Sequence, residues 1–226
     1  MTIDVYCFSG SGHSLAVASY CAAQLGTAVR PIEEPQGNAE RALVVFPVYC
    51  ENIPAPAKRF LQHLRAGYAA FIATYGGVSF GRVLWQAQKI YRGVTVAGAY
   101  FPTGHSFRAE QGPLGVEALL PLLHAIGRTE PVHIPKTPKH PLSDFAPSLR
   151  SRIGVKLLRS DVCDGCGICT QNCPVHTMRA GVPGGACIRC LRCVRLCPKG
   201  ALSFSVRPVL TNFLARRRKT DVVLYL

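Results

Sequence analysis

Eight cysteines in two equally spaced groups constrain what the C-terminal part of this chain can fold into. The first group has the spacing Cys-x2-Cys-x2-Cys-x3-Cys-Pro from Cys163 to Pro174, and the second repeats it from Cys187 to Pro198. Three thiolates spaced by two residues let one tight loop bind three corners of an iron–sulfur cube, while the fourth cysteine leaves that loop for the other cube. The spacing therefore predicts two [4Fe–4S] clusters with alternating ligands.

Each predicted cluster takes three cysteines from one group and the last cysteine of the other. One set is Cys163, Cys166, Cys169 and Cys197, and the other is Cys187, Cys190, Cys193 and Cys173. Zinc is the alternative metal, since eight thiolates could also fill two zinc sites. Zinc sites usually use separated Cys-x2-Cys pairs rather than triplets followed by Cys-Pro, so the spacing favours clusters over zinc or disulfides.

The stretch from Val155 to Val206 resembles bacterial-type two-cluster ferredoxins, and their motif is matched at all eight cysteines. The resemblance implies a small α+β ferredoxin-like domain that its clusters stabilise. Thiolate ligands require reduced cysteines, and the N-terminus shows no export signal, so we expect a cytoplasmic protein. No run of about eighteen apolar residues is present to cross a bilayer.

The first 128 residues show a different pattern, in which apolar strands alternate with amphipathic helices. Strands are expected at 3–8, 42–46, 69–73 and 94–100. Helical spacing of apolar residues follows each strand, and Pro121 should interrupt the last helix, expected near 114–126. The alternation predicts an α/β domain with a doubly wound parallel sheet.

A Gly/Ser loop, Ser9-Gly10-Ser11-Gly12-His13-Ser14, joins the first expected strand to the first helix. Glycines let the backbone turn its N–H groups inward, and the hydroxyls add donors at the positive end of a helix dipole. The expected guest is a phosphate monoester. A plain strand-to-helix connection can have the same composition, so this loop alone does not establish a phosphate site. The neighbouring loops are needed to distinguish the two interpretations.

Two more loops follow the next strands. One is Pro47-Val48-Tyr49-Cys50-Glu51-Asn52-Ile53-Pro54 and the other is Thr74-Tyr75-Gly76-Gly77. In a parallel sheet the loops at the strand C-termini meet at one edge, so we expect a crevice there beside the phosphate loop. Tyr49 and Tyr75 are expected to supply its flat walls.

Together these residues resemble a flavodoxin domain over positions 1–128, and the whole chain is similar to the flavodoxin–ferredoxin fusion flavoproteins of anaerobes. The resemblance implies FMN. The family's phosphate motif, Ser/Thr-x-Thr-Gly-Asn-Thr/Ser, carries over onto Ser9, Gly10, Ser11, Gly12 and Ser14, while His13 stands where asparagine is typical. The flavin-facing positions carry over onto Pro47, Val48, Tyr49, Asn52, Thr74, Tyr75, Gly76 and Gly77, with 101–105 as a third wall.

Several other residues have simpler interpretations. Cys7 and Cys21 fall on an expected strand and helix, where they are expected to pack as small apolar residues. His105 is the candidate to deliver a proton to a reduced flavin. Five prolines between 129 and 150 predict a semi-extended linker, and residues 151–226 are expected to form the ferredoxin-like domain with a basic tail.

Charge is unevenly distributed along the chain. The net charge is +14, and residues 150–226 contribute +11 of it, with fourteen Lys and Arg against three Asp and Glu. Because Arg189, Arg192, Arg195 and Lys199 lie among or beside the cluster ligands, we expect an acidic redox protein of the ferredoxin or flavodoxin type to dock there. No pattern typical of DNA reading is present.

These features predict an iron–sulfur flavoprotein that transfers electrons between two [4Fe–4S] clusters and FMN in anaerobic metabolism. It would act either as a carrier between proteins or as a reductase of a small molecule, and a redox sensor is a third class. A reductase needs an open, partly apolar cavity beside the flavin, whereas a carrier needs only an exposed ring edge.

Overall fold

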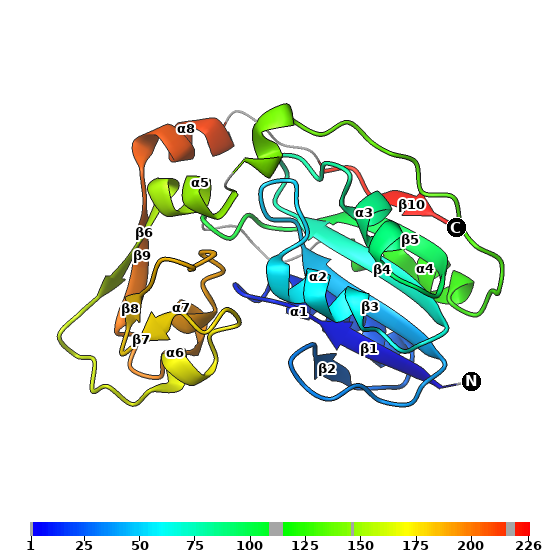
Figure 1. Cartoon of the computed structure of the whole chain (residues 1–226), viewed down its shortest axis with the longest axis horizontal. Helices are drawn as coiled ribbons and strands as arrows, with labels where there is room; N and C mark the ends of the chain where they lie inside the picture. Colours follow the sequence, from blue (N-terminus) through cyan, green and yellow to red (C-terminus); the bar gives the residue numbers. More distant parts are fainter. Residues whose placement is uncertain (1, 109–114, 146, 216–219) are drawn as a thin grey trace.

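The protein consists of an α/β region and a smaller cysteine-rich region that lie side by side (Figure 1). This computed structural model describes the chain except residues 1, 109–114, 146 and 216–219. In the described part, no helix is long and apolar enough to cross a membrane.

A six-stranded sheet forms the α/β region. Five strands are parallel and have the order β2-β1-β3-β4-β5, which is the flavodoxin-like order, and β10 adds to β5 in the antiparallel direction. The strands are β1 (Ile3–Cys7), β2 (Val29–Pro31), β3 (Arg41–Pro47), β4 (Tyr68–Tyr75), β5 (Val94–Pro102) and β10 (Val223–Tyr225). The predicted fold class is confirmed.

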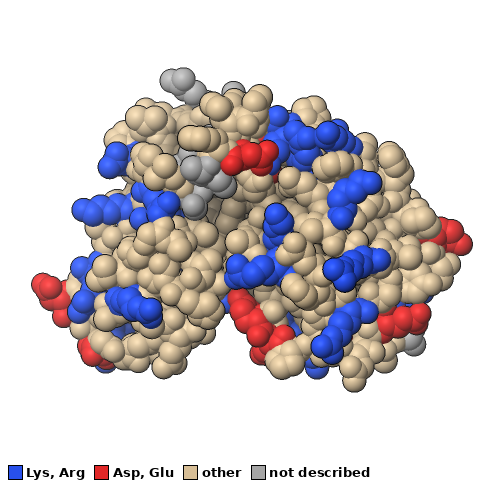
Figure 2. Space-filling view, in the orientation of Figure 1, with Lys and Arg blue, Asp and Glu red and all other residues tan. Residues whose placement is uncertain are grey.

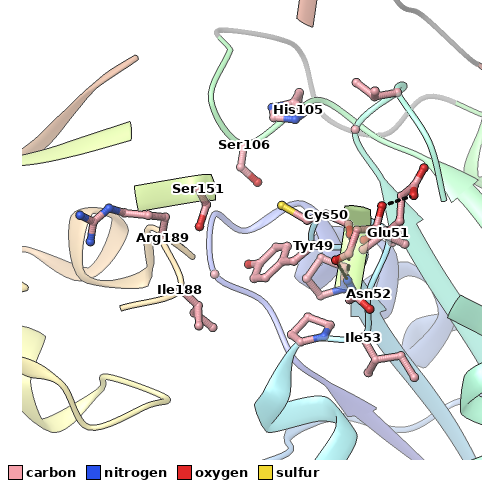
Figure 3. Close-up of a pocket in the computed structure, with 18 of the residues that line it drawn as sticks. Tyr49, Cys50, Glu51, Asn52, Ile53, His105, Ser106, Ser151, Ile188 and Arg189 are labelled. Carbon is pink, nitrogen blue, oxygen red and sulfur yellow. Dashed lines mark hydrogen bonds between the residues drawn. The ribbon is translucent and has the colours of Figure 1, made fainter. Parts of the chain in front are cut away.

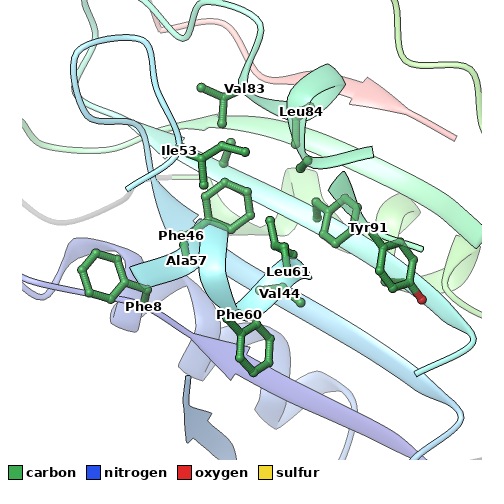
Figure 4. Packing of buried hydrophobic residues seen from close by; sticks show 14 of the residues in the cluster. Phe8, Val44, Phe46, Ile53, Ala57, Phe60, Leu61, Val83, Leu84 and Tyr91 are labelled. Carbon is green, nitrogen blue, oxygen red and sulfur yellow. The ribbon is translucent and has the colours of Figure 1, made fainter. Parts of the chain in front are cut away.

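Helices cover both faces of this sheet because the strand residues alternate in direction. One face packs against α1 (His13–Gln24) and α4 (Leu120–Ala125), and the other against α2 (Ala55–Gln62) and α3 (Val83–Ile90). We call the core under α1 and α4 the first core and the core under α2 and α3 the second core. Along β1, Val5 and Cys7 are buried in the first core and Tyr6 is buried in the second. Figure 4 shows aromatic and aliphatic side chains of β3 and α2 meeting in the second core.

Pro121 interrupts the last expected helix, as the sequence predicts. Pro121 occupies the first turn of α4, where its missing N–H costs no helical hydrogen bond. The residues before it form the separate 3-10 turn η1 (Val116–Leu119). The expected helix therefore divides at this proline.

Both ends of the cysteine-rich region are tied to the α/β region. The linker crosses α3 and β5 in an extended form: Ile134 is buried in the second core and the Val132 N–H donates to the Thr95 carbonyl. It then forms the 3-10 turn η2 (Pro141–Asp144). The chain returns at β10, which pairs with β5, although the sequence placed residues 151–226 together with the cysteines.

Short elements build the cysteine-rich region. They are α5 (Pro147–Gly154), β6 (Val155–Arg159), α6 (Ile168–Gln171), β7 (Met178–Arg179), β8 (Val182–Pro183), α7 (Arg192–Leu196), β9 (Leu202–Val206) and α8 (Pro208–Ala215). Strand β6 pairs with β9 and β7 pairs with β8, both antiparallel. The basic residues predicted to follow α8 lie outside the described residues.

The two cysteine groups have the same backbone shape. Positive φ angles occur at three pairs of positions separated by 24 residues, the same interval that separates Cys163 from Cys187. The pairs are Gly165 with Arg189, Gly167 with Leu191, and His176 with Gly200. Because non-glycine residues rarely adopt this conformation, its repetition indicates that both loops curl around an equivalent centre.

Candidate functional site

The Gly/Ser loop follows the C-terminal end of β1 and leads directly into α1. Gly12 has a φ of 108°, a conformation that favours glycine, and its N–H donates to Ser9 Oγ at 3.2 Å. Helix α1 begins at the next residue, so the N–H groups of its first turn face the loop. This is the arrangement in which proteins bind phosphate groups.

Hydroxyl groups from three loops converge around the start of α1. Ser14 Oγ lies 2.7 Å from Thr74 Oγ1, and Ser11 Oγ lies 2.9 Å from Ser106 Oγ. Ser11 Oγ also lies 3.2 Å from His13 Nδ1. The residues fit a phosphate group, since hydroxyl donors surround the positive end of a helix.

A cleft of about 1730 Å³ opens between the two regions beside this loop. Figure 3 shows Tyr49, Cys50 and Ser106 on its α/β side and Ile188, Arg189 and Ser151 on the opposite side. Most of the predicted flavin-site residues line it: Gly10, Ser11, His13, Ser14, Pro47, Val48, Tyr49, Asn52, Thr74, Gly76 and His105. The loops at the strand C-termini therefore meet as the sequence predicts.

Several residues predicted to form the walls have other surroundings. Tyr75 is 2% exposed in the second core, and its hydroxyl donates to the Asp221 carbonyl at 2.7 Å, so its ring does not line the cleft. Burial, followed by the nearby Asp221, raises the pKa of Tyr75 to about 12. Other predicted residues that do not line the cleft are Gly77, Phe101 and Pro102, together with Ser9 and Gly12 of the Gly/Ser loop.

Asn52 lines the cleft, but its side chain holds the linker. The amide nitrogen donates to the Ser143 carbonyl at 2.7 Å, and the amide oxygen accepts from Lys139 Nζ at 2.6 Å. Glu51 beside it accepts from the Ser143 hydroxyl and from the His140 N–H. Burial opposes ionisation of Glu51, yet these hydrogen bonds, with one from Ser79, outweigh it and lower its pKa.

His105 lines the cleft and lies directly over Gly76. A Cβ atom on Gly76 would approach His105 Cδ2 to 2.5 Å, so the ring fits only over glycine. His105 Nδ1 accepts the Phe107 N–H at 3.2 Å, which leaves a neutral ring protonated at Nε2. A proton at that atom is what a proton-donating role requires.

Sequence reasoning missed Ser106 and the cleft residues that come from the cysteine-rich region. Ser106 directly follows the predicted third wall, so extending that wall by one residue would have found it. Ser151, Ile188 and Arg189 belong to the cysteine-rich region. No local pattern predicts them, because their position depends on how the two regions pack.

Four cysteines, which we call the outer set, line one small cavity at the far side of the cysteine-rich region. They are Cys163, Cys166, Cys169 and Cys197, so three come from the first group and one from the second. Pro198, Ala201 and Leu202 complete the apolar lining. The cavity therefore brings together the four cysteines that the alternating assignment groups, and their role as ligands stays a prediction.

The other four cysteines, which we call the inner set, are Cys173, Cys187, Cys190 and Cys193. Burial raises the pKa of Cys190 to about 11, and the nearby thiols of Cys187 and Cys173 add to the rise. Burial also raises the pKa of Cys193 to about 12, with further contributions from Cys190 and Cys187. These interactions link the four thiols with one another, and Cys169 of the outer set also contributes to the raised pKa of Cys193.

Thiolate chemistry fits iron–sulfur clusters at both sets. In the described residues no three Cys, His, Asp or Glu side chains form a group that could hold a metal ion. The four thiolates of a cube bind different irons, so they need not converge on one point as the ligands of one ion do.

The inner set packs against the Gly/Ser loop. A Cβ atom on Gly10 would lie 2.0 Å from the Cys190 carbonyl oxygen, so the two backbones are in direct contact. Arg192 Nε donates to the Ser9 carbonyl at 3.1 Å, and Arg195 Nε donates to the Gly10 carbonyl at 2.9 Å. Both arginines, which the sequence assigned to partner docking, are therefore engaged within the molecule.

Three cysteines lie outside the two sets. Cys7 and Cys21 are buried in the first core, and burial raises the pKa of each thiol to about 12. Both therefore pack as small apolar residues, as predicted. Cys50 is exposed and lines the cleft with a φ of 50°.

Two known proteins are similar to parts of this chain. No known family model matches it. An uncharacterized protein of Methanocaldococcus jannaschii is 38% identical over 61 residues, which are 26% of this chain and 25% of that protein, so the match spans about a quarter of the relative. A crystal structure of a "putative flavoprotein" from Bacteroides eggerthii covers 54% of this chain and 98% of its own, with 15% identity and a TM-score of 0.39.

Proposed function

We propose that this protein is an iron–sulfur flavoprotein that transfers electrons between two [4Fe–4S] clusters and an FMN. One observation supports this above the others: the inner cysteine set lies in backbone contact with the Gly/Ser loop, through Gly10 and Cys190. The clusters handle single electrons, and FMN handles one or two. Closeness of the two sites favours such an exchange.

In this proposal the Gly/Ser loop binds the FMN phosphate. Backbone N–H groups at the start of α1 and the hydroxyls of Ser11 and Ser14 would donate to it. Tyr49 from the next loop would flank the flavin ring, and the linker would hold that loop in place through Asn52. His105 would hold a proton at Nε2 near the cleft.

Cofactor content tests this proposal. Anaerobically purified protein should contain about eight irons and eight sulfides per chain, because each cube takes four cysteines. It should also contain one FMN. Four irons, or zinc in place of iron, would contradict the cluster assignment, and protein that neither contains nor binds FMN would contradict the flavin assignment.

A second candidate function is a flavin-dependent reductase of a small molecule. The cleft supports it, because about 1730 Å³ exceeds the roughly 300–1000 Å³ of an ordinary small-molecule site and leaves room beside a flavin. The wall opposite the flavin loops is apolar at Ile153, Val209 and Leu210. Steady-state oxidation of reduced protein by candidate acceptors would separate the two: a carrier alone shows no saturable small-molecule turnover.

The expected partner remains an acidic redox protein of the ferredoxin or flavodoxin type. The charge of the cysteine-rich part supports it, and in Figure 2 Lys and Arg side chains lie over both lobes of the visible face. Arg192 and Arg195 bind the Gly/Ser loop within the molecule. Of the basic residues that the sequence assigned to docking, the exposed Lys199, beside Cys197, lies near the outer set. We place docking at the outer set.

A further inference from the structure

We propose that Arg192 and Arg195 are positioning residues for the phosphate group of FMN, although both belong to the cysteine-rich region. The inference rests on the proposed function, since it concerns how that flavin is bound. Their guanidinium groups contact two consecutive peptide groups of the Gly/Ser loop. The cysteine-rich region thereby helps to shape a binding site that lies in the α/β region.

These contacts fix the orientation of two peptide groups in the loop. In a trans peptide the C=O and the following N–H point in opposite directions. Arg192 Nε fixes the Ser9 carbonyl, so the Gly10 N–H faces away from it, and Arg195 Nε fixes the Gly10 carbonyl, so the Ser11 N–H does the same. In the described part of the chain neither N–H forms a hydrogen bond.

The two sides of the loop differ accordingly. Gly10 and Ser11 line the cleft, whereas Arg192 and Arg195 line a separate hollow on the other side of the loop with Ser9. The arginines therefore hold the carbonyls on one side and leave the two N–H groups directed toward the side where a phosphate would bind.

Further contacts keep Arg192 in place. Its Nη1 lies 2.6 Å from Glu33 Oε1, in the segment that follows β2, and its guanidinium lies over the Phe8 ring at 5.2 Å. Arg195 Cδ would lie 3.4 Å from a Cβ atom on Gly12, so this side chain also limits the turn into α1. Each arginine thus contacts the loop through specific hydrogen bonds and packing as well as through its charge.

Comparison of FMN with riboflavin tests the proposal, since only FMN carries the phosphate. Full-length, cluster-loaded protein is freed of flavin and titrated with each ligand by fluorescence quenching. In the Arg192→Gln/Arg195→Gln variant the Kd for FMN should rise about tenfold, the loss expected when charged hydrogen bonds to the loop are removed. The Kd for riboflavin should not change, so the ratio of the two Kd values should fall.

The matched control is Arg159→Gln/Arg179→Gln, which removes the same two charges from exposed positions on β6 and β7. It should leave both Kd values unchanged. Equal weakening of FMN and riboflavin in the Arg192→Gln/Arg195→Gln variant, or no weakening of either, would overturn the proposal, because a general loosening of the two regions does not single out phosphate.

The single variant Arg195→Gln is included in case the double variant does not fold. Because Arg195 is exposed, its replacement should disturb the fold less. If the double variant loses iron, this single variant decides: a fall in the ratio supports the proposal and an unchanged ratio overturns it. Failure of the proposed function looks different, since unsubstituted protein would then not bind FMN at all.

Discussion

The two cysteine sets have the same spacing and the same backbone shape but opposite surroundings. The inner set is buried against the α/β region: Cys173, Cys187, Cys190 and Cys193 are 9, 7, 9 and 9% exposed. In the outer set Cys166 is exposed and the others are half-buried. A doubled motif thus builds two similar centres, and the packing of the two regions makes one of them internal and leaves the other accessible.

This difference assigns separate tasks to the two sets. The inner set shares a boundary with the loop proposed to bind FMN, whereas the outer set is where another protein can approach. Because the linker and β10 hold the cysteine-rich region at both ends, this relation does not depend on a freely moving domain. The predictions below test it, beginning with the largest expected effect.

Replacing the fourth cysteine of each group should remove the cluster that is farther away in the sequence. Cys173→Ala should abolish the inner cluster and leave about four irons, because its thiolate completes the set formed by the second group. Cys197→Ala should abolish the outer cluster instead. Iron counts and electron paramagnetic resonance of the reduced variants identify which cluster remains.

The same pair of variants separates the two surroundings. Cys173→Ala should also weaken FMN binding, because the inner set contacts the Gly/Ser loop, whereas Cys197→Ala should not. Loss of the cluster nearest in sequence to each substitution would contradict the alternating ligand assignment.

A methyl group on Gly10 should force the two regions apart. The added Cβ would lie 2.0 Å from the Cys190 carbonyl oxygen, and backbone at that distance cannot move aside cheaply. We expect Gly10→Ala to cost about 1–3 kcal/mol of stability, the range for overpacking. Chemical denaturation of the cluster-loaded protein measures it.

Gly67→Ala is the control for that substitution, because the nearest atom to its added Cβ would be 3.9 Å away, an ordinary contact. It should leave stability nearly unchanged. If Gly10→Ala is as stable as the control, the contact between Gly10 and Cys190 is looser than described and the inner set is less tightly docked.

The sequence predicted what depends on local pattern and missed what depends on packing between distant residues. Strand alternation predicted the sheet correctly, whereas the cluster ligands inferred from cysteine spacing stay a prediction. Tyr75 was misplaced because β4 continues two residues beyond its expected end, and the alternation of the strand then directs the ring into the core with Phe71. The contact of Arg192 with Ser9 joins residues 183 positions apart, which no local pattern contains.

Exposure to a chelator under oxidising conditions should remove the outer cluster before the inner one. Access to the iron requires an open path, and the outer cysteines are the more exposed. We expect an intermediate with about four irons, whose spectrum matches that of Cys197→Ala protein. Iron release followed over time, with spectra at each point, tests the order. Simultaneous loss of both clusters would show that burial does not distinguish the two sets.

Salt dependence of electron transfer should show the smallest effect, because the surroundings of the outer set are of mixed charge. Lys199 is exposed there, but so are Asp161 and Asp164. The net charge of the cysteine-rich part should still steer an acidic redox protein, so its second-order rate of reaction should fall as the Debye length shrinks from about 30 Å at 0.01 M salt to about 10 Å at 0.1 M. Stopped-flow mixing with an acidic ferredoxin measures this rate.

Lys199→Glu tests where that steering acts. It reverses one charge beside Cys197, and we expect a several-fold slower rate at low salt with the difference vanishing at high salt, since screening removes the contribution of an exposed charge. Lys156→Glu, on the exposed side of β6, is the control for the same change of charge away from the outer cavity. If both variants slow the reaction equally, only net charge steers the partner; if Lys199→Glu alone does so, the partner docks at the outer set, as its exposure favours.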